Sequence, residues 1–291
     1  MSEHSNAIVT ASYAPDFERC RLLCETIDLH VSSFKRHYLL VEGRDVAQFR
    51  ALESAHRIVV DERDILPSWL RPFNDPLIPG RRIWLSLRTM PLRGWHVQQL
   101  RRIAIAGHID EEALIFCDSD VVFVKPLDCG LFWNDDKVKL LRHDNALERP
   151  QISDQYIWSR NAGEVLGIES PKMSLNDYIS TVIAWRRSSI VSMCQHIENV
   201  QGMNWVAAVA RRRKFSECML YGRFVDEIAG GAGHFHSATE LCHVHWEGKP
   251  MSDREFRTFV DEMEPEQVAV GMQSAIGTDV SRIRRLVLED A

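Results

Sequence analysis

Two aspartates separated by one serine are the residues of this sequence best suited to hold a cation. Asp118, Ser119 and Asp120 follow the apolar run 113–117, which predicts a buried strand. Residues two apart on an extended chain point to the same side, so both carboxylates face one way. Two close carboxylates repel each other unless a cation lies with them, and oxygen ligands suit Mg²⁺ or Mn²⁺. The spacing therefore predicts a divalent-cation site that takes further ligands from water and phosphate oxygens.

The segments before this motif predict a parallel α/β sheet. Strand-like and helical patterns alternate at short intervals, which is typical of parallel strands joined by helices. Ligands of such sheets bind outside the carboxyl ends of the strands, where Asp118 and Asp120 lie. The predicted elements are strands at 7–12, 38–41, 57–60 and 113–117, and helices that begin after Asp16, at 46–52 and at 95–106.

The second half of the chain reads mostly as helices. The Pro-rich stretch 61–94 has no clear periodicity and predicts a long surface excursion, and long loops in compact domains are usually functional. Further strands are expected at 121–124, 137–141 and 240–246, and helices at 175–198, 205–212, 217–228 and 266–289.

Composition limits the possible functions. The chain has 291 residues, is 45% hydrophobic and carries a formal net charge of −6. It can therefore bury a large core, and it lacks the basic excess of a dedicated nucleic-acid binder. No acidic residue occurs from Pro76 to Ile109, which suggests a basic flank for a small anion such as a diphosphate. The arginines of this stretch are Arg81, Arg82, Arg88, Arg93, Arg101 and Arg102.

We expect a cytoplasmic protein, because no targeting signal is recognised and the cysteines are scattered. The first residues resemble no signal peptide, no apolar run is long enough for a bilayer, and seven scattered cysteines suggest free thiols. The stretch 266–289 carries Val280, Ile283, Leu286 and Val287 at helical spacing among arginines. We expect this helix to dock on its own domain, with membrane contact at most peripheral.

Four segments together resemble GT-A glycosyltransferases of the metal-dependent D-x-D type, and specifically a bacterial group of these enzymes. The segments are 94–99, 117–126, 185–187 and 215–222. The resemblance covers roughly residues 7–250. It implies an α/β GT-A fold, Rossmann-like, with a mostly parallel sheet between helices and helical C-terminal additions. The implied domains are a catalytic domain 1–250, with a nucleotide-binding half 1–126 and an acceptor half 127–250, and a helical extension 251–291.

The resemblance also implies an activity and a set of site residues. A sugar would pass from a UDP- or GDP-sugar to a hydroxyl of a glycan, lipid or other acceptor, with no nucleic-acid partner. Asp118, Asp120 and His245 would hold Mn²⁺ or Mg²⁺, and Glu217 would be the base, with Asp154 and Asp226 in reserve. The implied nucleotide-sugar contacts are Thr10, Ser12, Tyr13, Asp16, Arg19, Gln98, Gln99, Arg102, Asp118, Ser119 and Lys249. One helix carries Gln98, Gln99 and Arg102, so we expect at least one of them to be structural.

Different functions and structural roles for the same residues remain open. The sequence Asp118 to Val122 also fits the D-x-D-x-[TV] pattern of haloacid-dehalogenase-type phosphohydrolases, and a non-catalytic nucleotide- or carbohydrate-binding protein would keep the same fold. The four histidines His234, His236, His243 and His245 suggest a zinc site as a further possibility. Structural roles are also open: capping by the aspartates or by Ser216 with Glu217, a surface pair of Asp16 with Arg19, and a packed His245.

Overall fold

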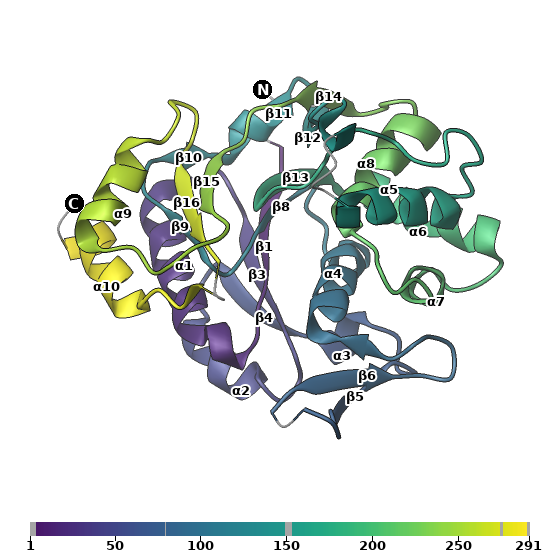
Figure 1. Ribbon diagram of the computed structural model, residues 1–291, viewed down its shortest axis with the longest axis horizontal. Helices are drawn as coiled ribbons and strands as arrows, with labels where there is room; N and C mark the ends of the chain where they lie inside the picture. Colours follow the sequence, from purple (N-terminus) through teal and green to yellow (C-terminus); the bar gives the residue numbers. More distant parts are fainter. Residues whose placement is uncertain (1–3, 79, 149–152, 274–275, 290–291) are drawn as a thin grey trace.

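A central sheet of five strands organises the computed structural model, which describes residues 4–78, 80–148, 153–273 and 276–289 (Figure 1). The strand order is β13-β8-β1-β3-β4. Four strands are parallel, and the edge strand β13 runs antiparallel to β8. The expected fold class, a mixed α/β fold with a mostly parallel sheet between helices, is therefore confirmed. The strands are β1 (Asn6–Ala11), β3 (Arg36–Val41), β4 (Arg57–Asp61), β8 (Ala113–Cys117) and β13 (Val182–Arg186).

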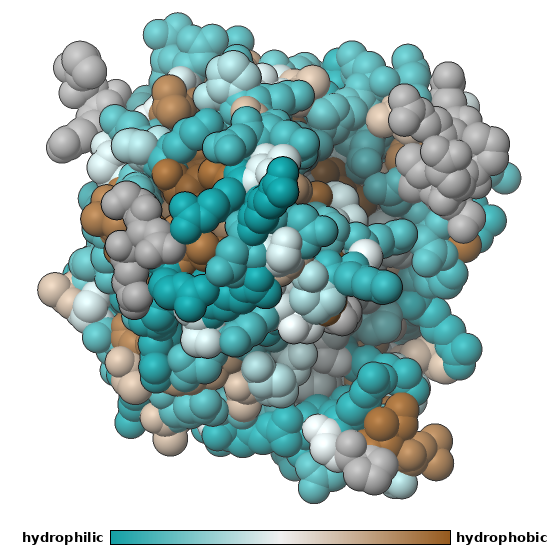
Figure 2. Space-filling model, turned by 60° about the vertical axis from the view of Figure 1, so that its left-hand side comes forward, coloured by the Kyte–Doolittle hydropathy of each residue, from teal (hydrophilic) through white to brown (hydrophobic). Residues whose placement is uncertain are grey.

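A second, smaller sheet lies beside helix α1 (Phe17–His30) and has the order β15-β16-β9. Its strands are β15 (Cys242–His245), β16 (Ala269–Met272) and β9 (Val121–Phe123). The expected helix 266–289 is therefore wrong at Ala269–Met272, where every residue is buried and extended. The α-helical part begins only at α10 (Val280–Arg284). The outer surface on this side of the molecule is mostly hydrophilic (Figure 2).

The C-terminal segment docks on its own domain, as expected. Ile283 and Val287 are buried in a cluster with Leu22 of α1 and Val122 of β9. Residues 251–291 thus contribute a strand to this sheet in addition to helices α9 (Asp253–Asp261) and α10. No helix in the part of the chain that the structure describes has the length and apolar character needed to cross a membrane.

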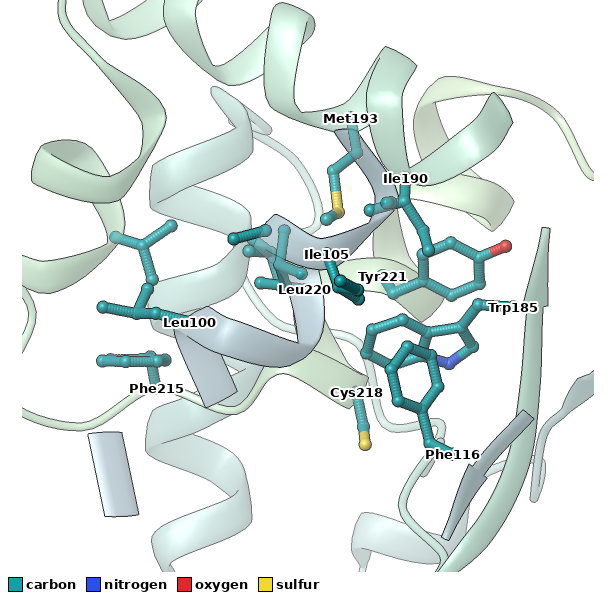
Figure 3. Close-up of a cluster of buried hydrophobic side chains, with 14 of the residues drawn as sticks. Leu100, Ile105, Phe116, Trp185, Ile190, Met193, Phe215, Cys218, Leu220 and Tyr221 are labelled. Carbon is teal, nitrogen blue, oxygen red and sulfur yellow. The ribbon is translucent and has the colours of Figure 1, made fainter. Parts of the chain in front are cut away.

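The alternation of side chains along β1 explains why the central sheet is covered on both faces. Val9 packs into the cluster beneath the later helices, whereas Ile8 packs against α1. Figure 3 shows the first cluster, where the ring of Trp185 lies between Phe116 and Tyr221, with centroids 4.6 Å away on each side. The helices on this face are α4 (Gly94–Ala104), α5 (Ser153–Leu166), α6 (Arg187–Gln201), α7 (Trp205–Ala210) and α8 (Glu217–Arg223).

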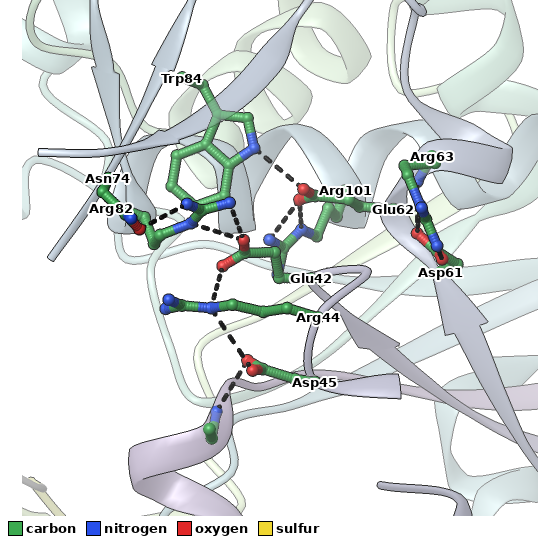
Figure 4. Close-up of polar contacts among 11 residues, drawn as sticks. Glu42, Arg44, Asp45, Asp61, Glu62, Arg63, Asn74, Arg82, Trp84 and Arg101 are labelled. Atoms are coloured by element: carbon green, nitrogen blue, oxygen red, sulfur yellow. Dashed lines mark hydrogen bonds and ion pairs between the residues drawn. The ribbon is translucent and has the colours of Figure 1, made fainter. Parts of the chain in front are cut away.

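The stretch 61–94 is folded, contrary to the expected irregular excursion. It forms α3 (Glu62–Ile65) and an antiparallel sheet in the order β5-β6-β7. Two glutamates that follow central strands hold this sheet (Figure 4). Glu42 accepts from Arg82 Nε at 2.7 Å, and Glu62 accepts from Trp84 Nε1 at 3.0 Å. The strands are β5 (Arg71–Asn74), β6 (Arg82–Leu85) and β7 (Leu92–Arg93).

The expected helix 175–198 is wrong in its first half, because Val182–Arg186 is the strand β13 and helix α6 begins only at Arg187. Helix α5 was not expected at all. The remaining elements are short strands and one short helix. They are β2 (Val31–Ser32), α2 (Val46–Phe49), β10 (Leu127–Asp128), β11 (Trp133–Asn134), β12 (Lys137–Leu141) and β14 (His234–Ser237).

Candidate active site

The cleft of interest opens where the strand order of the central sheet reverses. β1 is followed in space by β3 and β4 on one side and by β8 on the other. The crevice outside the carboxyl ends of two such strands is the usual ligand site of an open α/β sheet. A cleft of about 190 Å³ lies there. Its lining residues are Asp16, Trp95, Gln98, Gln99, Arg102, Asp118, Ser119, Asp120 and Glu217.

Arg102 joins two carboxylates in the floor of the cleft. Its Nη1 lies 3.3 Å from Asp118 Oδ1 and 3.0 Å from Glu217 Oε1. The guanidinium packs over the ring of Phe116, with 4.8 Å between its central carbon and the ring centroid. Burial raises the pKa of both carboxyls, and the charge of Arg102 opposes that rise. The three side chains therefore form one coupled, largely buried charge cluster.

The cleft lining is strongly acidic. Four carboxylates, those of Asp16, Asp118, Asp120 and Glu217, face one guanidinium, that of Arg102, which gives a formal charge of −3. Burial raises the pKa of Asp16, with Arg19 opposing. A cleft of this charge attracts cations and repels a bare phosphate or diphosphate.

Two glutamines connect the walls of the cleft. Gln98 Nε2 donates to the carbonyl of Ala11 at the end of β1 at 3.0 Å. Gln99 Oε1 accepts from the backbone N–H of Glu217 at 3.0 Å. Both glutamines therefore also serve a structural purpose, as expected for at least one residue of this helix, while all three expected residues of α4 line the cleft.

Glu217 reaches the cleft because helix α8 begins beside it. Ser216 is the N-cap and accepts from the backbone N–H of Met219 at 3.4 Å. Capping is therefore performed by Ser216, and the Glu217 carboxylate is left to pair with Arg102. The side chain of Glu217 is only 7% exposed. Its charged form is favoured first by Arg102 and then by the backbone N–H groups of Glu217 and Cys218.

Of the residues expected to contact the nucleobase and ribose, some are buried in the protein and others lie near the cleft. Thr10 is fully buried and its Oγ1 lies 3.1 Å from His37 Nε2, so its side chain points into the protein and not into the cleft. Ser12 is also buried. Tyr13 is 46% exposed, and Asp120 is among the charges that raise its pKa, after partial burial and Asp16, so it lies at the rim. Arg19 donates to the carbonyl of Thr278 at 3.2 Å, behind Asp120.

His245 does not join the two aspartates, because strand β16 separates them. Met272 of β16 pairs in register with His245 and donates its N–H to the carbonyl of Asp120 at 3.2 Å. His245 and Lys249 instead line a second cavity of about 460 Å³ beside α9. Within residues 4–78, 80–148, 153–273 and 276–289, no three His, Cys, Asp or Glu side chains form a metal-binding group. His245 therefore lies apart from Asp118 and Asp120, with which it was expected to share a cation.

The histidines considered for zinc and the two reserve bases also lie away from the cleft. His243 stacks on Phe259 and His234 bonds to Tyr221, so the described histidines do not form a zinc site. The reserve bases are occupied as well: Asp154 pairs with Lys214, and Asp226 accepts from Tyr178, Arg142 and His236.

The acid-free stretch contributes less to the cleft than expected, since only Arg102 of its six arginines lines it. Arg82 pairs with Glu42, and Arg101 Nε donates to Glu62 at 2.8 Å (Figure 4).

The structure adds Trp95 to the residues of the site. Trp95 lines the mouth of the cleft, is 49% exposed and lies 5.7 Å from the ring of Trp158. Its position one helical turn before Gln98 is the sequence signal that identifies it.

Residues 6–266 match the model of a family described as "Family of unknown function (DUF6492)". No curated protein matches the sequence. A solved structure of the galactosyltransferase LgtC in complex with donor and acceptor sugar analogs is 12% identical, with 97% of this chain and 95% of that chain covered and a TM-score of 0.49. An active-site mutant of LgtC is 13% identical, with 91% and 86% covered and a TM-score of 0.46.

Proposed function

The chain belongs to the family of unknown function DUF6492, and we propose that it is a metal-dependent glycosyltransferase that uses a nucleoside-diphosphate sugar. The observation that carries the proposal is the acidic cleft at the strand-order reversal, where Asp118, Asp120 and Glu217 lie together with Arg102. A diphosphate is repelled by a formal charge of −3 unless a divalent cation accompanies it. A donor that binds as its metal complex fits both the charge and the position of this cleft.

The residues present fit a hard divalent cation held by two carboxylates. Asp118 and Asp120 would hold Mg²⁺ or Mn²⁺, which commonly takes its other ligands from water and phosphate oxygens. Such a cation neutralises the charge that develops on a leaving diphosphate. Arg102 keeps one oxygen of Asp118 engaged at 3.3 Å, so it orients this carboxylate and also adds positive charge beside the leaving group.

Glu217 is the proposed base. Its pKa is raised by burial, which makes the carboxylate a better proton acceptor at neutral pH than an exposed glutamate. The acceptor hydroxyl would give its proton to this carboxylate as its oxygen bonds to the sugar carbon and the nucleoside diphosphate leaves. Trp95 at the mouth of the cleft offers a flat apolar surface on which the sugar or the nucleobase of the donor would stack.

Calorimetry with nucleotides tests the metal-linked part of this proposal. UDP and GDP are titrated into the wild type, into Asp120→Asn and into the exposed control Asp261→Asn, with Mn²⁺ and with a chelator. The substitution at Asp120 should weaken binding when Mn²⁺ is present and strengthen it when metal is removed, since one repelling charge is lost. The control should match the wild type. Nucleotide binding that is unaffected by both the metal and the Asp120 substitution would refute the proposed role of the metal.

Turnover separates the enzyme from its rivals. Hydrolysis or transfer from a UDP- or GDP-sugar by the wild type, abolished in Glu217→Gln while nucleotide binding persists, supports the transferase. Nucleotide binding without turnover of any donor indicates a binding protein. Turnover of a generic phosphate ester that disappears in Asp118→Asn indicates a phosphohydrolase and refutes the proposal.

A further inference from the structure

A second surface feature, which the cleft does not use, lies at the turn between β6 and β7. Three aliphatic side chains stand in solvent here: Leu87 is fully exposed, Met90 is 41% exposed and Leu85 is 38% exposed. We call this region, together with its neighbouring arginines, the basic apolar face. Its members are Leu85, Leu87, Arg88, Met90, Arg93, Arg211 and Arg213.

These residues come from two parts of the chain, which hydrogen bonds bring together. Arg211 Nε donates to the carbonyl of Arg88 at 3.4 Å, and His96 bonds to the carbonyl of Arg213 at 2.9 Å. In Figure 1 the turn after β6 and helix α7 lie on the same side of the molecule. The connection between α7 and α8 therefore extends the charged part of the turn.

The small sheet that carries the face is anchored to the central strands. Trp84 of β6 is 2% exposed and is bonded to Glu62, and Arg82 is bonded to Glu42 (Figure 4). The aliphatic side chains are thus presented outward by an anchored sheet. Exposed leucines on an anchored turn cost solvation free energy that folding of this chain does not recover, and such patches usually mark a contact surface.

The arginines of the face keep their charge uncompensated. In the described part of the chain, Arg88, Arg93 and Arg213 have no carboxylate partner, whereas the neighbouring Arg212 and Lys214 pair with Glu164 and Asp154. No acidic residue occurs in the sequence from Pro76 to Ile109. The face is therefore locally positive on a protein whose formal net charge is −6.

We propose that the basic apolar face docks on the surface of an anionic lipid bilayer. Leu87, with Leu85 and Met90 beside it, enters the boundary between headgroups and acyl chains, and the arginines contact lipid phosphates. A second copy is a poor occupant, because a two-fold interface would oppose two identical positive faces. Nucleic acid would leave the aliphatic side chains without bases to stack on, since single strands are bound on aromatic rings.

Vesicle sedimentation tests this inference independently of any enzymatic activity. The full chain is mixed with phosphatidylcholine vesicles and with vesicles that also contain phosphatidylglycerol. We expect binding to the anionic vesicles only, and weaker binding as salt is raised. Each arginine near an anionic surface contributes about fivefold to partitioning, so Arg88→Gln with Arg93→Gln should weaken binding about 25-fold. Leu87→Ser should weaken it roughly tenfold.

A matched control and four opposing outcomes make the test decisive. Leu131 is 63% exposed and lies outside the face, so Leu131→Ser should bind vesicles like the wild type. Circular dichroism confirms that each variant is folded. Equal binding to neutral vesicles, or binding unchanged by the substitutions in the face, overturns the inference. So does a dimer that Leu87→Ser dissociates, or binding to RNA or DNA in place of lipid.

Discussion

Replacing Arg102 with methionine should destabilise the protein strongly and in a pH-dependent way. The guanidinium is 9% exposed and is bonded to Glu217, which is 7% exposed, and to Asp118, which is 35% exposed. Methionine is close in length and keeps the contact with Phe116, so the main change is the loss of the positive charge. The carboxylates of Asp118 and Glu217 then share the floor of the cleft without the guanidinium of Arg102.

The expected magnitude follows from the burial of each partner. Removing one member of a buried ion pair costs about 3–5 kcal/mol, because the other charge remains buried and unpaired. This range applies to Glu217. Asp118 is partly solvated, so its share is at most about 1 kcal/mol. We therefore expect the free energy of unfolding to fall by about 3–5 kcal/mol at about pH 8 in metal-free buffer.

The sign of the pH dependence is fixed by the direction of the pKa shifts. Burial already raises the pKa of Glu217, and Arg102 lowers it; without Arg102 that pKa rises further. Between the two folded-state pKa values the variant binds more protons than the wild type does. The deficit therefore shrinks as pH falls through this window, by up to about 1.4 kcal/mol per pH unit.

Urea unfolding at about pH 8 and about pH 5.5 measures both quantities. A second variant, Arg102→Met with Glu217→Gln, removes both charges of the pair and should recover much of the loss, with a weaker pH dependence. A deficit that stays constant or grows on acidification would refute the electrostatic reasoning. So would a double variant that is no more stable than Arg102→Met alone.

Three further outcomes are expected. Trp95→Ala should weaken nucleotide-sugar binding roughly tenfold by calorimetry, because stacking on an aromatic ring is lost, while the equally exposed Trp246→Ala should not. His245→Ala should leave the Mn²⁺ dependence of nucleotide binding unchanged, since β16 separates it from the aspartates; loss of that dependence would restore the three-ligand site. Gly222→Ala should lower the free energy of unfolding by more than about 2 kcal/mol in urea, because its Cβ would lie 2.2 Å from Tyr178, and a neutral effect would contradict this packing.

The sequence was sufficient where structure depends on local pattern. The strands β1, β3, β4 and β8 and the position of Asp118 after β8 follow from short apolar runs and from the regular alternation with helices. The reversal of strand order at β1 then brings the ends of β1 and β8 together. The carboxylate pair was identifiable because its chemistry and its position are both encoded within a few residues.

Two other strands, β13 and β16, could not be predicted in the same way. Val182–Arg186 and Ala269–Met272 are short apolar runs next to helices, and periodicity alone does not separate a buried strand from a buried helix segment. Their partners are remote: β13 pairs with β8, and β16 pairs with β9 and β15. Only tertiary pairing decides their conformation. His245 was expected beside the two aspartates because strand β16, which lies between them, was not predicted.

The arginines of the acid-free stretch were expected to flank an anion site, but two of them stabilise the fold instead. Their absence from the cleft still bears on the chemistry of its ligand. Arg82 and Arg101 are held by Glu42 and Glu62, where they fasten the small sheet and helix α4 to the central strands. They are thus unable to neutralise a ligand in the cleft, whose lining residues carry four carboxylates and the single guanidinium of Arg102. An anionic ligand must then bring its own positive charge, and a divalent cation bound to a diphosphate does so. The use of these arginines for folding is therefore itself an argument for the metal dependence that we propose.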